Sequence, residues 1–257
     1  MEVSGTQSIH RAIVLLRAIA SSGRGGSRLL DLAKHANLTA PTAHRILRCL
    51  VAENIVTQDS ETHRYLLGHL VFELGLAAAP QFNLRQIAGP ALRRVAEKTG
   101  DTAFLIARSG FDTVCLDRQE GAFPIKALTL DVGTRRPLGV GAGGMALLLP
   151  LADGEIERIV AANATRLRNY GKLNVPIALG MIARAKQLGY ALNDRQETPG
   201  VISIGLPVTN RYGPPYAAIS VGAISSRMSA ERQKEIAAVL RIELRSLEKR
   251  LAEAASA

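Results

Sequence analysis

Apolar positions recur at helical spacing three times near the start of the chain. The first predicted helix has its apolar face at Ile9, Ile13, Leu16 and Ile19 or Ala20. Ser8 fits the N-cap position of this helix, and the glycine-rich stretch 22–27 ends it. A second, shorter helix is predicted over residues 29–36, with Leu29, Leu32, Ala33 and Ala36 buried. The pattern therefore predicts that the chain begins with a small helical domain.

The third predicted helix has one apolar and one cationic face. At 100° per residue its apolar positions share one side, and they are Ala43, Ile46, Leu47 and Leu50. The opposite side carries Pro41, Arg45, Arg48 and Ala52, flanked by Thr42, His44 and Cys49. Asn37 suits a left-handed turn before this helix, Thr39 suits its N-cap, and Pro41 suits its first turn. The helix is expected to run to about Glu53.

A polar turn between two short β-rich stretches completes the N-terminal domain. Residues 55–57 and 64–67 predict strands joined at Asp59–Thr62. Three helices followed by a β-hairpin form a winged helix-turn-helix. In that motif the second helix buries one side and places the other in the DNA major groove, where arginine can bind guanine with two hydrogen bonds.

This geometry assigns expected roles to the polar residues. Thr42 and Arg45 are the best candidates for base contacts, and His44 and Arg48 could serve bases or phosphates. Arg64 is expected to bind backbone phosphate, which positions the protein without specifying sequence. With the helix start, the predicted DNA-facing set is Thr39, Pro41, Thr42, His44, Arg45, Arg48 and Arg64. The alternative is a solvated helix face that binds no ligand.

The remaining chain alternates helices and strands irregularly. Helices are predicted at 69–79 (ending at Pro80), 84–99 (ending at Gly100), 155–163 and 177–188, with a last helix capped by Ser229. Strands are predicted at 102–108, 112–119, 123–130, 201–209 and 216–223, the last two around the turn 211–214. This order favours a mixed α+β domain over a doubly wound sheet.

Charge and composition narrow the choice of partner. The formal net charge of +10 suggests an anionic partner. Residues 1–70 hold eight Lys/Arg, five Asp/Glu and all five histidines, so the positive excess is not confined to that region. No apolar run reaches the ~18 residues of a membrane span. Two cysteines, Cys49 and Cys115, fit a reducing compartment, and the N-terminus lacks a secretory pattern. We therefore expect a cytoplasmic protein with no membrane partner.

The sequence resembles the IclR family of bacterial transcription regulators along nearly its whole length. The resemblance rests on SIHRAIVLLRAIA, LLDLAKHANLTAPTAHRILRCLVAENIV, HRYLLG, LVFELG, NLRQIAGPALRRVAEKTGDTAFLIA, VGTRRPLG, LGYALNDRQETPGV and AAISVGAISSRMS. It implies a winged helix-turn-helix at 1–68, a linker helix at 69–80, and an effector-binding and oligomerisation domain at 81–257 related to the GAF and profilin-like folds. It also implies a homodimer or a dimer of dimers (homotetramer) that binds an approximately palindromic operator.

The resemblance further implies a small organic acid effector. In the family, the ligand carboxylate lies near a glycine-rich helix start, which here is GVGAGGMALL (139–148). The corresponding effector residues are Ala142 and Gly143 at the helix start, together with Leu128, Arg136, Asn193, Ser203 and Ser220. Relatives commonly read HATALGKA where this chain reads GVGAGGMA, and an acid common in the family is Asn193 here. We expect Arg136 to neutralise the carboxylate; the alternative is a surface arginine beside Arg135.

Enzyme and metal functions find little support in the sequence. GVGAGG matches a dinucleotide-binding fingerprint, but TRRPL precedes it instead of a buried strand and no acid follows at the required distance. Residues 70–257 contain no histidine and one cysteine, which leaves few metal ligands and no base for Ser203 or Ser220. We therefore expect a non-enzymatic repressor or activator without a cofactor. The alternative is a ligand-binding or protein-interaction module with only non-specific affinity for DNA.

Overall fold

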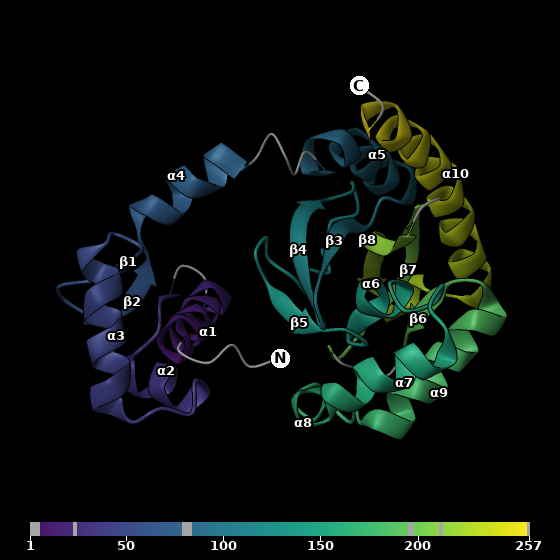
Figure 1. The fold of residues 1–257 in the computed structure, drawn as a ribbon. Helices are drawn as coiled ribbons and strands as arrows, with labels where there is room; N and C mark the ends of the chain where they lie inside the picture. Colours follow the sequence, from purple (N-terminus) through teal and green to yellow (C-terminus); the bar gives the residue numbers. More distant parts are fainter. Residues whose placement is uncertain (1–5, 23–24, 79–83, 195–197, 211–212, 256–257) are drawn as a thin grey trace. The chain divides into compact units, whose positions relative to one another are not determined.

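The structure is a computed structural model that describes residues 6–22, 25–78, 84–194, 198–210 and 213–255. The chain divides into two compact units, Met1–Asn83 and Leu84–Ala257. Each unit has its own arrangement of helices and strands (Figure 1). The predicted domain boundary and the end of the linker helix at Pro80 lie outside the described residues.

The N-terminal unit contains helices and one two-stranded sheet. Its elements are α1 (Gln7–Ser21), α2 (Leu29–His35), α3 (Ala40–Ala52), β1 (Val56–Gln58), β2 (Tyr65–Leu67) and α4 (His69–Ala78). The first three helices and the hairpin bury one apolar cluster, which includes Leu15, Ile19, Leu32, Leu47 and Tyr65. This arrangement is the predicted winged helix-turn-helix.

The apolar face predicted for α1 was wrong in its first half. Ile9 is 64% exposed and Ile13 is 42% exposed, whereas Leu15, Ala18 and Ile19 are buried. The helix also begins before Ser8, with Thr6 at the N-cap position and no side-chain capping bond. Ala12, in the first half of the helix, packs against the same core, so the buried face of α1 runs through Ala12, Leu15 and Ile19 and leaves Ile9 and Ile13 outside it.

The turn between α2 and α3 follows the sequence prediction. Asn37 adopts the left-handed conformation, with φ 52°. Thr39 occupies the N-cap position of α3 with an extended backbone, and Pro41 lies in the first turn. The Thr39 side chain does not cap the helix as expected, because its Oγ1 lies 2.9 Å from Oγ1 of Thr42. The predicted start of the helix is confirmed, but the predicted capping bond from the Thr39 side chain is not formed.

The hairpin after α3 is held by a local turn. β1 and β2 are antiparallel, with Gln58 opposite Tyr65. Within the turn, Oδ1 of Asp59 accepts hydrogen bonds from the backbone N–H (2.7 Å) and the hydroxyl (2.7 Å) of Thr62. These bonds favour the charged carboxylate and lower the pKa of Asp59. The turn is therefore a defined element and not a loose connection.

The C-terminal unit is built on one antiparallel sheet of six strands. The strand order is β5-β4-β3-β8-β7-β6. The bounds are β3 (Thr102–Ser109), β4 (Asp112–Gln119), β5 (Arg135–Pro137), β6 (Ala191–Asn193), β7 (Val201–Asn210) and β8 (Gly213–Ile224). The β3–β4 and β7–β8 hairpins were predicted; residues 211–212 of the second turn lie outside the described part. Pairing of β3 with β8 joins the two hairpins into one sheet.

Helices cover both faces of this sheet (Figure 1). Their bounds are α5 (Leu84–Thr99), α6 (Gly141–Ala146), α7 (Asp153–Ala162), α8 (Ala164–Leu167), α9 (Val175–Leu188) and α10 (Ala230–Ala255), with a short 3-10 turn at Ser225–Arg227. α5 and α10 pack on one face around a core that includes Leu105 and Ile219. α6, α7 and α9 pack on the other around Phe104, Ile106 and Met145. Because successive side chains of a strand point to opposite faces, neighbouring residues of β3 lie in the two different cores.

Two ends predicted for these helices are confirmed. α5 ends at Thr99, and Gly100 follows in the left-handed conformation with φ 71°. At the start of α10, the hydroxyl of Ser229 accepts a hydrogen bond from the backbone N–H of Arg232 at 3.2 Å. The residue types at these positions were sufficient to locate both helix ends.

A strand predicted at 123–130 is wrong. None of these residues is in a strand, and Arg135–Pro137 forms β5 instead. Arg136 pairs with Thr113 and Arg135 with Val114 along the edge of β4. Only one segment can occupy that edge, and β-propensity alone does not identify which one.

A buried glutamate with two exposed cationic partners connects the helices on the first face. Glu243 of α10 accepts hydrogen bonds from Arg94 (2.7 Å) and Lys98 (2.7 Å) of α5. Burial raises the pKa of Glu243, but the hydrogen bonds from Lys98 and Arg94 outweigh it and leave the pKa below its usual value. The carboxylate therefore stays charged and holds α5 against α10.

Candidate functional site

The exposed face of α3 is a cationic surface. Ala43, Leu47 and Leu50 are buried in the core of the unit, as predicted. His44, Arg45, Arg48 and Cys49 are exposed and line one shallow hollow on the opposite side. α3 itself contains no Asp or Glu that could neutralise these arginines within the helix. One side of α3 anchors the helix, and the other is available to an anionic partner.

The start of α3 adds short polar groups to this face. Pro41 is exposed and Thr42 is partly buried. The bond between the hydroxyls of Thr39 and Thr42 satisfies one hydrogen-bonding position on each and leaves further capacity on both oxygens. The predicted residues of α3 and its N-cap thus lie along one exposed stretch of helix.

Arg64 makes internal contacts that the sequence did not indicate. Its Nη1 donates hydrogen bonds to the carbonyl oxygens of Gly25 (3.2 Å) and Gly26 (3.0 Å). The side chain thereby ties the hairpin to the loop before α2. A guanidinium carries five N–H groups, so contact with phosphate remains compatible with these bonds.

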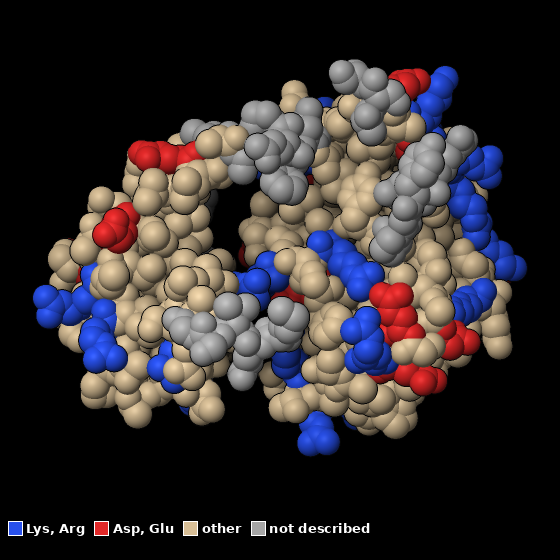
Figure 2. Space-filling view, viewed as in Figure 1, with Lys and Arg blue, Asp and Glu red and all other residues tan. Residues whose placement is uncertain are grey.

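Charge is unevenly distributed over the visible face of the N-terminal unit (Figure 2). Lys and Arg side chains lie along the side formed by α3, and acidic side chains lie toward α4. A cationic face on a helix of this motif suits the phosphates and base edges of duplex DNA.

A small polar pocket lies in the C-terminal unit between the sheet, α6 and the segment before β5. Its volume is about 40 Å³. The lining comprises Phe104, Ile106, Thr113, Thr129, Leu130, Arg136, Val140, Gly141, Ala142, Gly143, Gly144, Asn193, Thr198, Val201, Ser203 and Ser220. We call it the anion pocket, because an arginine and several hydroxyl groups converge on it.

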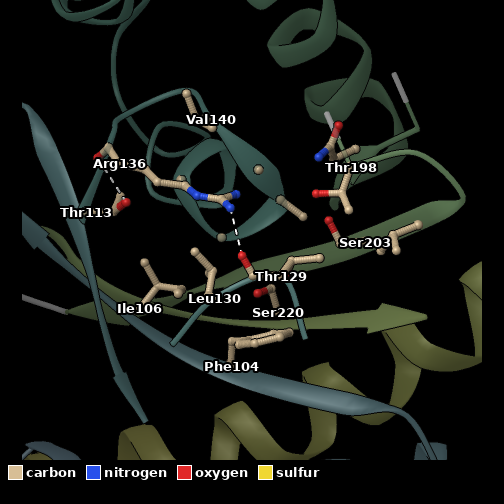
Figure 3. Close-up of a pocket in the computed structure, with 16 residues that line it drawn as sticks. Phe104, Ile106, Thr113, Thr129, Leu130, Arg136, Val140, Thr198, Ser203 and Ser220 are labelled. Carbon is tan, nitrogen blue, oxygen red and sulfur yellow. Dashed lines mark hydrogen bonds between the residues drawn. The ribbon is translucent and has the colours of Figure 1, made fainter. Parts of the chain in front are cut away.

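Arg136 is the cationic group of the anion pocket (Figure 3). Adjacent strand residues point to opposite sides, so Arg135 pairs with Asp112 at 3.3 Å while Arg136 reaches the pocket. Nη2 of Arg136 donates a hydrogen bond to the carbonyl oxygen of Thr129 at 2.8 Å. Its guanidinium carbon lies 5.6 Å from the centre of the Tyr170 ring. These contacts hold the charged group in a defined position.

Strand register places the other polar groups. Asn193 pairs with Ser203 across β6 and β7, and Ser220 pairs with Phe104 across β8 and β3. Figure 3 shows the Ser203 and Ser220 hydroxyls across the pocket from the Arg136 side chain. The pocket therefore combines one cation, hydroxyl and amide groups, and an apolar floor from β3.

Two glycines allow α6 to approach the sheet closely. A Cβ on Gly143 would lie 2.6 Å from Cγ1 of Ile106, and a Cβ on Gly205 would lie 2.6 Å from the carbonyl oxygen of Ala142. A side chain at either position would force the neighbouring atoms to move. The glycine-rich start of α6 thus forms one wall of the pocket because there is no side chain at 143 or 205.

Six of the seven predicted effector residues line the anion pocket: Arg136, Ala142, Gly143, Asn193, Ser203 and Ser220. Leu128 does not. Its side chain is 53% exposed, and Thr129 and Leu130 line the pocket in its place. Leu128 was carried over from the family resemblance, and in this chain the next two residues line the pocket instead.

The sequence did not single out several residues that line the pocket. Phe104 and Ile106 contribute the floor, and Thr113 donates a hydrogen bond to the backbone carbonyl of Arg136 at 3.2 Å. Period-two alternation places Phe104 and Ile106 on one face of β3. Phe104 lies opposite Ser220 and Ile106 opposite Ala218 because β3 pairs with β8, a strand more than a hundred residues further along the chain.

A winged helix-turn-helix followed by an α+β domain defines a class of DNA-binding transcription regulators. Within that class, the chain belongs to the IclR family. Residues 8–60 match the IclR helix-turn-helix domain, and residues 76–247 match the family model described as "Bacterial transcriptional regulator IclR C-terminal". The family consists of transcription regulators and not enzymes.

Individual relatives extend over most of the chain. The HTH-type transcriptional repressor AllR of Escherichia coli (strain K12) is 29% identical over 231 residues, which cover 89% of this chain and 84% of that repressor. An IclR transcriptional regulator from Alicyclobacillus acidocaldarius is 21% identical, covers 95% of this chain and 98% of its own, and superposes with a TM-score of 0.75. An IclR homologue from Microbacterium hydrocarbonoxydans, complexed with 4-hydroxybenzoate, is 21% identical over 96% of this chain and 100% of its own, with a TM-score of 0.72. The two structures show that the fold is shared.

Two further properties concern the described residues. Among them, no helix is both long enough and apolar enough to cross a membrane. The same part of the chain holds no group of three or more His, Cys, Asp or Glu side chains placed to bind a metal ion.

The Cys115 thiol is buried, and burial raises its pKa to about 11.

Proposed function

We propose that this IclR-family regulator binds an approximately palindromic operator through α3 and that a small organic acid in the anion pocket modulates that binding. The observation that carries the proposal is the exposed cationic face of α3 opposite its buried face. Thr42 and Arg45 contact base edges, and His44 and Arg48 contact bases or phosphates. Arg64 contacts the phosphate backbone, and Thr39 and Pro41 complete the DNA-facing surface.

The second part of the proposal rests on the anion pocket. Arg136 supplies the positive charge, and the hydroxyls of Ser203 and Ser220 supply hydrogen bonds. The homologue complexed with 4-hydroxybenzoate supports an acid as the ligand class. Ala142, Gly143 and Asn193 complete the ligand surface.

The link between the two activities is thermodynamic. We place two winged helices of a homodimer, alone or within a dimer of dimers, on the half-sites of the operator. The acid changes operator affinity only to the extent that it prefers one arrangement of the winged helices. The helix α4 follows the winged helix in sequence and transmits the change.

The test of operator recognition uses sheared DNA from the source genome. The purified full-length protein and Arg45→Ala are each used to recover fragments, which are then sequenced. A small set of sites sharing an inverted repeat, recovered by the wild type and lost by the variant, supports sequence-specific regulation. Uniform, salt-sensitive recovery by both proteins would contradict it and would leave only non-specific attraction to a polyanion.

The test of effector control uses the sites recovered in that experiment. Operator binding is titrated with candidate acids for the wild type and Arg136→Gln. A shift in operator affinity that the variant loses supports the assigned role of Arg136. An identical dose response in both proteins would remove Arg136 from the effector site.

A further inference from the structure

A second cavity adjoins the anion pocket. Its volume is about 340 Å³. It is lined by Gly139, Gly141, Tyr170, Lys172, Leu173, Ile177, Gly180, Met181, Arg184 and Asn193. Gly141 and Asn193 line both spaces, so the two spaces meet at these residues. We call the second space the α9 cavity, because α9 contributes much of its lining.

The two spaces differ in chemistry. Leu173, Ile177 and Met181 give the α9 cavity an apolar surface. The charge of Arg184 is compensated, because its Nη1 lies 2.6 Å from Oδ2 of Asp194. An apolar cavity with few polar groups suits the hydrocarbon part of a ligand. Lys172 also lines the α9 cavity and is exposed, whereas Arg136 and the hydroxyl groups that suit an anion line the other space.

The two spaces also differ in size. A cavity must offer about 10–15 Å³ to hold one water molecule, so the 40 Å³ of the anion pocket accommodates a group of a few heavy atoms. That is the size of a carboxylate with one or two further atoms. The 340 Å³ of the α9 cavity lies within the range of small-molecule sites, about 300–1,000 Å³. A larger acid fits only if its hydrocarbon part lies outside the anion pocket.

One contact joins the two linings directly. Arg136 lines the anion pocket and Tyr170 lines the α9 cavity. The guanidinium carbon of Arg136 lies 5.6 Å from the centre of the Tyr170 ring, in cation–π geometry. The group that attracts an anion is therefore positioned by a ring that forms part of the apolar lining.

We infer that the anion pocket and the α9 cavity form one bipartite site for an amphiphilic carboxylic acid. The carboxylate lies beside Arg136, and an aryl or branched alkyl body occupies the α9 cavity beside Tyr170. This inference rests on the proposed effector function and specifies its ligand class. Short acids that lack such a body fill only the first compartment and bind more weakly.

Gly180 offers a way to fill the α9 cavity alone. Gly180 lies in the middle of α9, lines that cavity and is exposed, and a Cβ built on it meets no atom within 4 Å. Leucine is a better helix former than glycine, so Gly180→Leu is compatible with the helix. Gly180→Ala is the matched control, because it gives the same change in backbone freedom with little added volume.

The experiment is isothermal titration calorimetry of the full-length protein with two probes, propionate and 3-phenylpropionate. We expect 3-phenylpropionate to bind the wild type more tightly than propionate. Gly180→Leu is expected to lower the affinity for 3-phenylpropionate by about tenfold or more. The affinity of this variant for propionate should stay within about twofold of the wild-type value. Gly180→Ala retains both affinities, and Arg136→Gln weakens both probes. Thermal melting of each variant confirms that the fold is retained.

The outcomes separate this inference from the proposed function. If Gly180→Leu leaves 3-phenylpropionate binding unchanged, or if only propionate binds the wild type, the bipartite site is overturned and acid binding stands. If neither acid binds the wild type, acid control through this pocket is overturned together with the inference. The bipartite site is supported if Gly180→Leu and Arg136→Gln lose affinity for 3-phenylpropionate while the wild type and Gly180→Ala keep it.

Discussion

Alanine at Gly143 and at Gly144 should have opposite effects, although the two residues are adjacent in α6. A Cβ on Gly143 would lie 2.6 Å from Cγ1 and 3.3 Å from Cβ of Ile106, and 3.3 Å from Oγ of Ser220. Ile106 is buried on β3, which is paired on both sides, so it has little room to move. A Cβ on Gly144 would meet its nearest atom at 3.5 Å, which is ordinary contact.

The magnitude follows from two opposing contributions. Overpacking a core lowers the stability of the fold by about 1–3 kcal/mol. Replacing glycine by alanine within a helix raises it by about 0.5–1 kcal/mol. Gly143→Ala is therefore expected to lower the free energy of unfolding by about 1–2 kcal/mol. Gly144→Ala is expected to be neutral or to raise it by up to about 1 kcal/mol. The same clash narrows the anion pocket, because Gly143 and Ile106 both line it.

The assay is thermal unfolding of the full-length variants, followed by titration with an acid that binds the wild type. One kcal/mol corresponds to a shift in Tm of roughly 2–4 °C for a unit of this size. Gly143→Ala should melt below Gly144→Ala by several degrees and bind the acid more weakly. Equal Tm values for the two variants would refute the claim that α6 and β3 require a glycine at 143.

Other substitutions and reagents test separate features. Glu243→Gln should lower the free energy of unfolding by about 2 kcal/mol at neutral pH, because the neutral amide has one acceptor oxygen where the carboxylate binds two cations. Since the pKa of Glu243 is lowered, its contribution is complete above the ordinary value of 4.5 and disappears as the pH falls through the folded-state pKa. Urea titrations in which the deficit of the variant persists unchanged in acid would contradict this. Leu47→Ala should cost about 2–5 kcal/mol in the same assay, since Leu47 is fully buried; a loss below 1 kcal/mol would mean that α3 is not anchored there. A thiol reagent should modify exposed Cys49 in the native protein but not Cys115, whose pKa is about 11, and rapid modification of both would contradict that burial.

The sequence predicted those elements that local chemistry determines. The two faces of α3, the left-handed Asn37 and the end of α5 at Gly100 all depend on residues within one turn of each other. Helical periodicity and the conformational preferences of Asn, Gly and Pro suffice at such positions. The prediction for Ile9 and Ile13 was wrong because the buried face of α1 runs through Ala12, Leu15 and Ile19, and apolar spacing alone did not distinguish this face from the predicted one.

The anion pocket was only partly predictable for a different reason. Arg136, Ser203 and Ser220 were carried over by resemblance to a family, and the structure places them around one cavity. Thr113 and Phe104 enter it through the pairing of strands distant in sequence, which no local pattern reveals. Leu128 was also carried over by resemblance, but it is exposed and its neighbours Thr129 and Leu130 line the cavity. Long-range register, rather than residue type, decides which side chains meet.

The central claim is that Arg45 of α3 reads DNA sequence, and one measurement tests it most directly. The affinities of the wild type, Arg45→Lys and Arg45→Ala for a recovered operator and for a scrambled duplex are compared at one salt concentration. Lysine keeps the charge but cannot form the two parallel hydrogen bonds that arginine makes to guanine. We predict that Arg45→Lys loses about 1–3 kcal/mol of discrimination while keeping its affinity for the scrambled duplex. Equal discrimination in all three proteins would contradict the claim and would leave the cationic face of α3 as a non-specific surface.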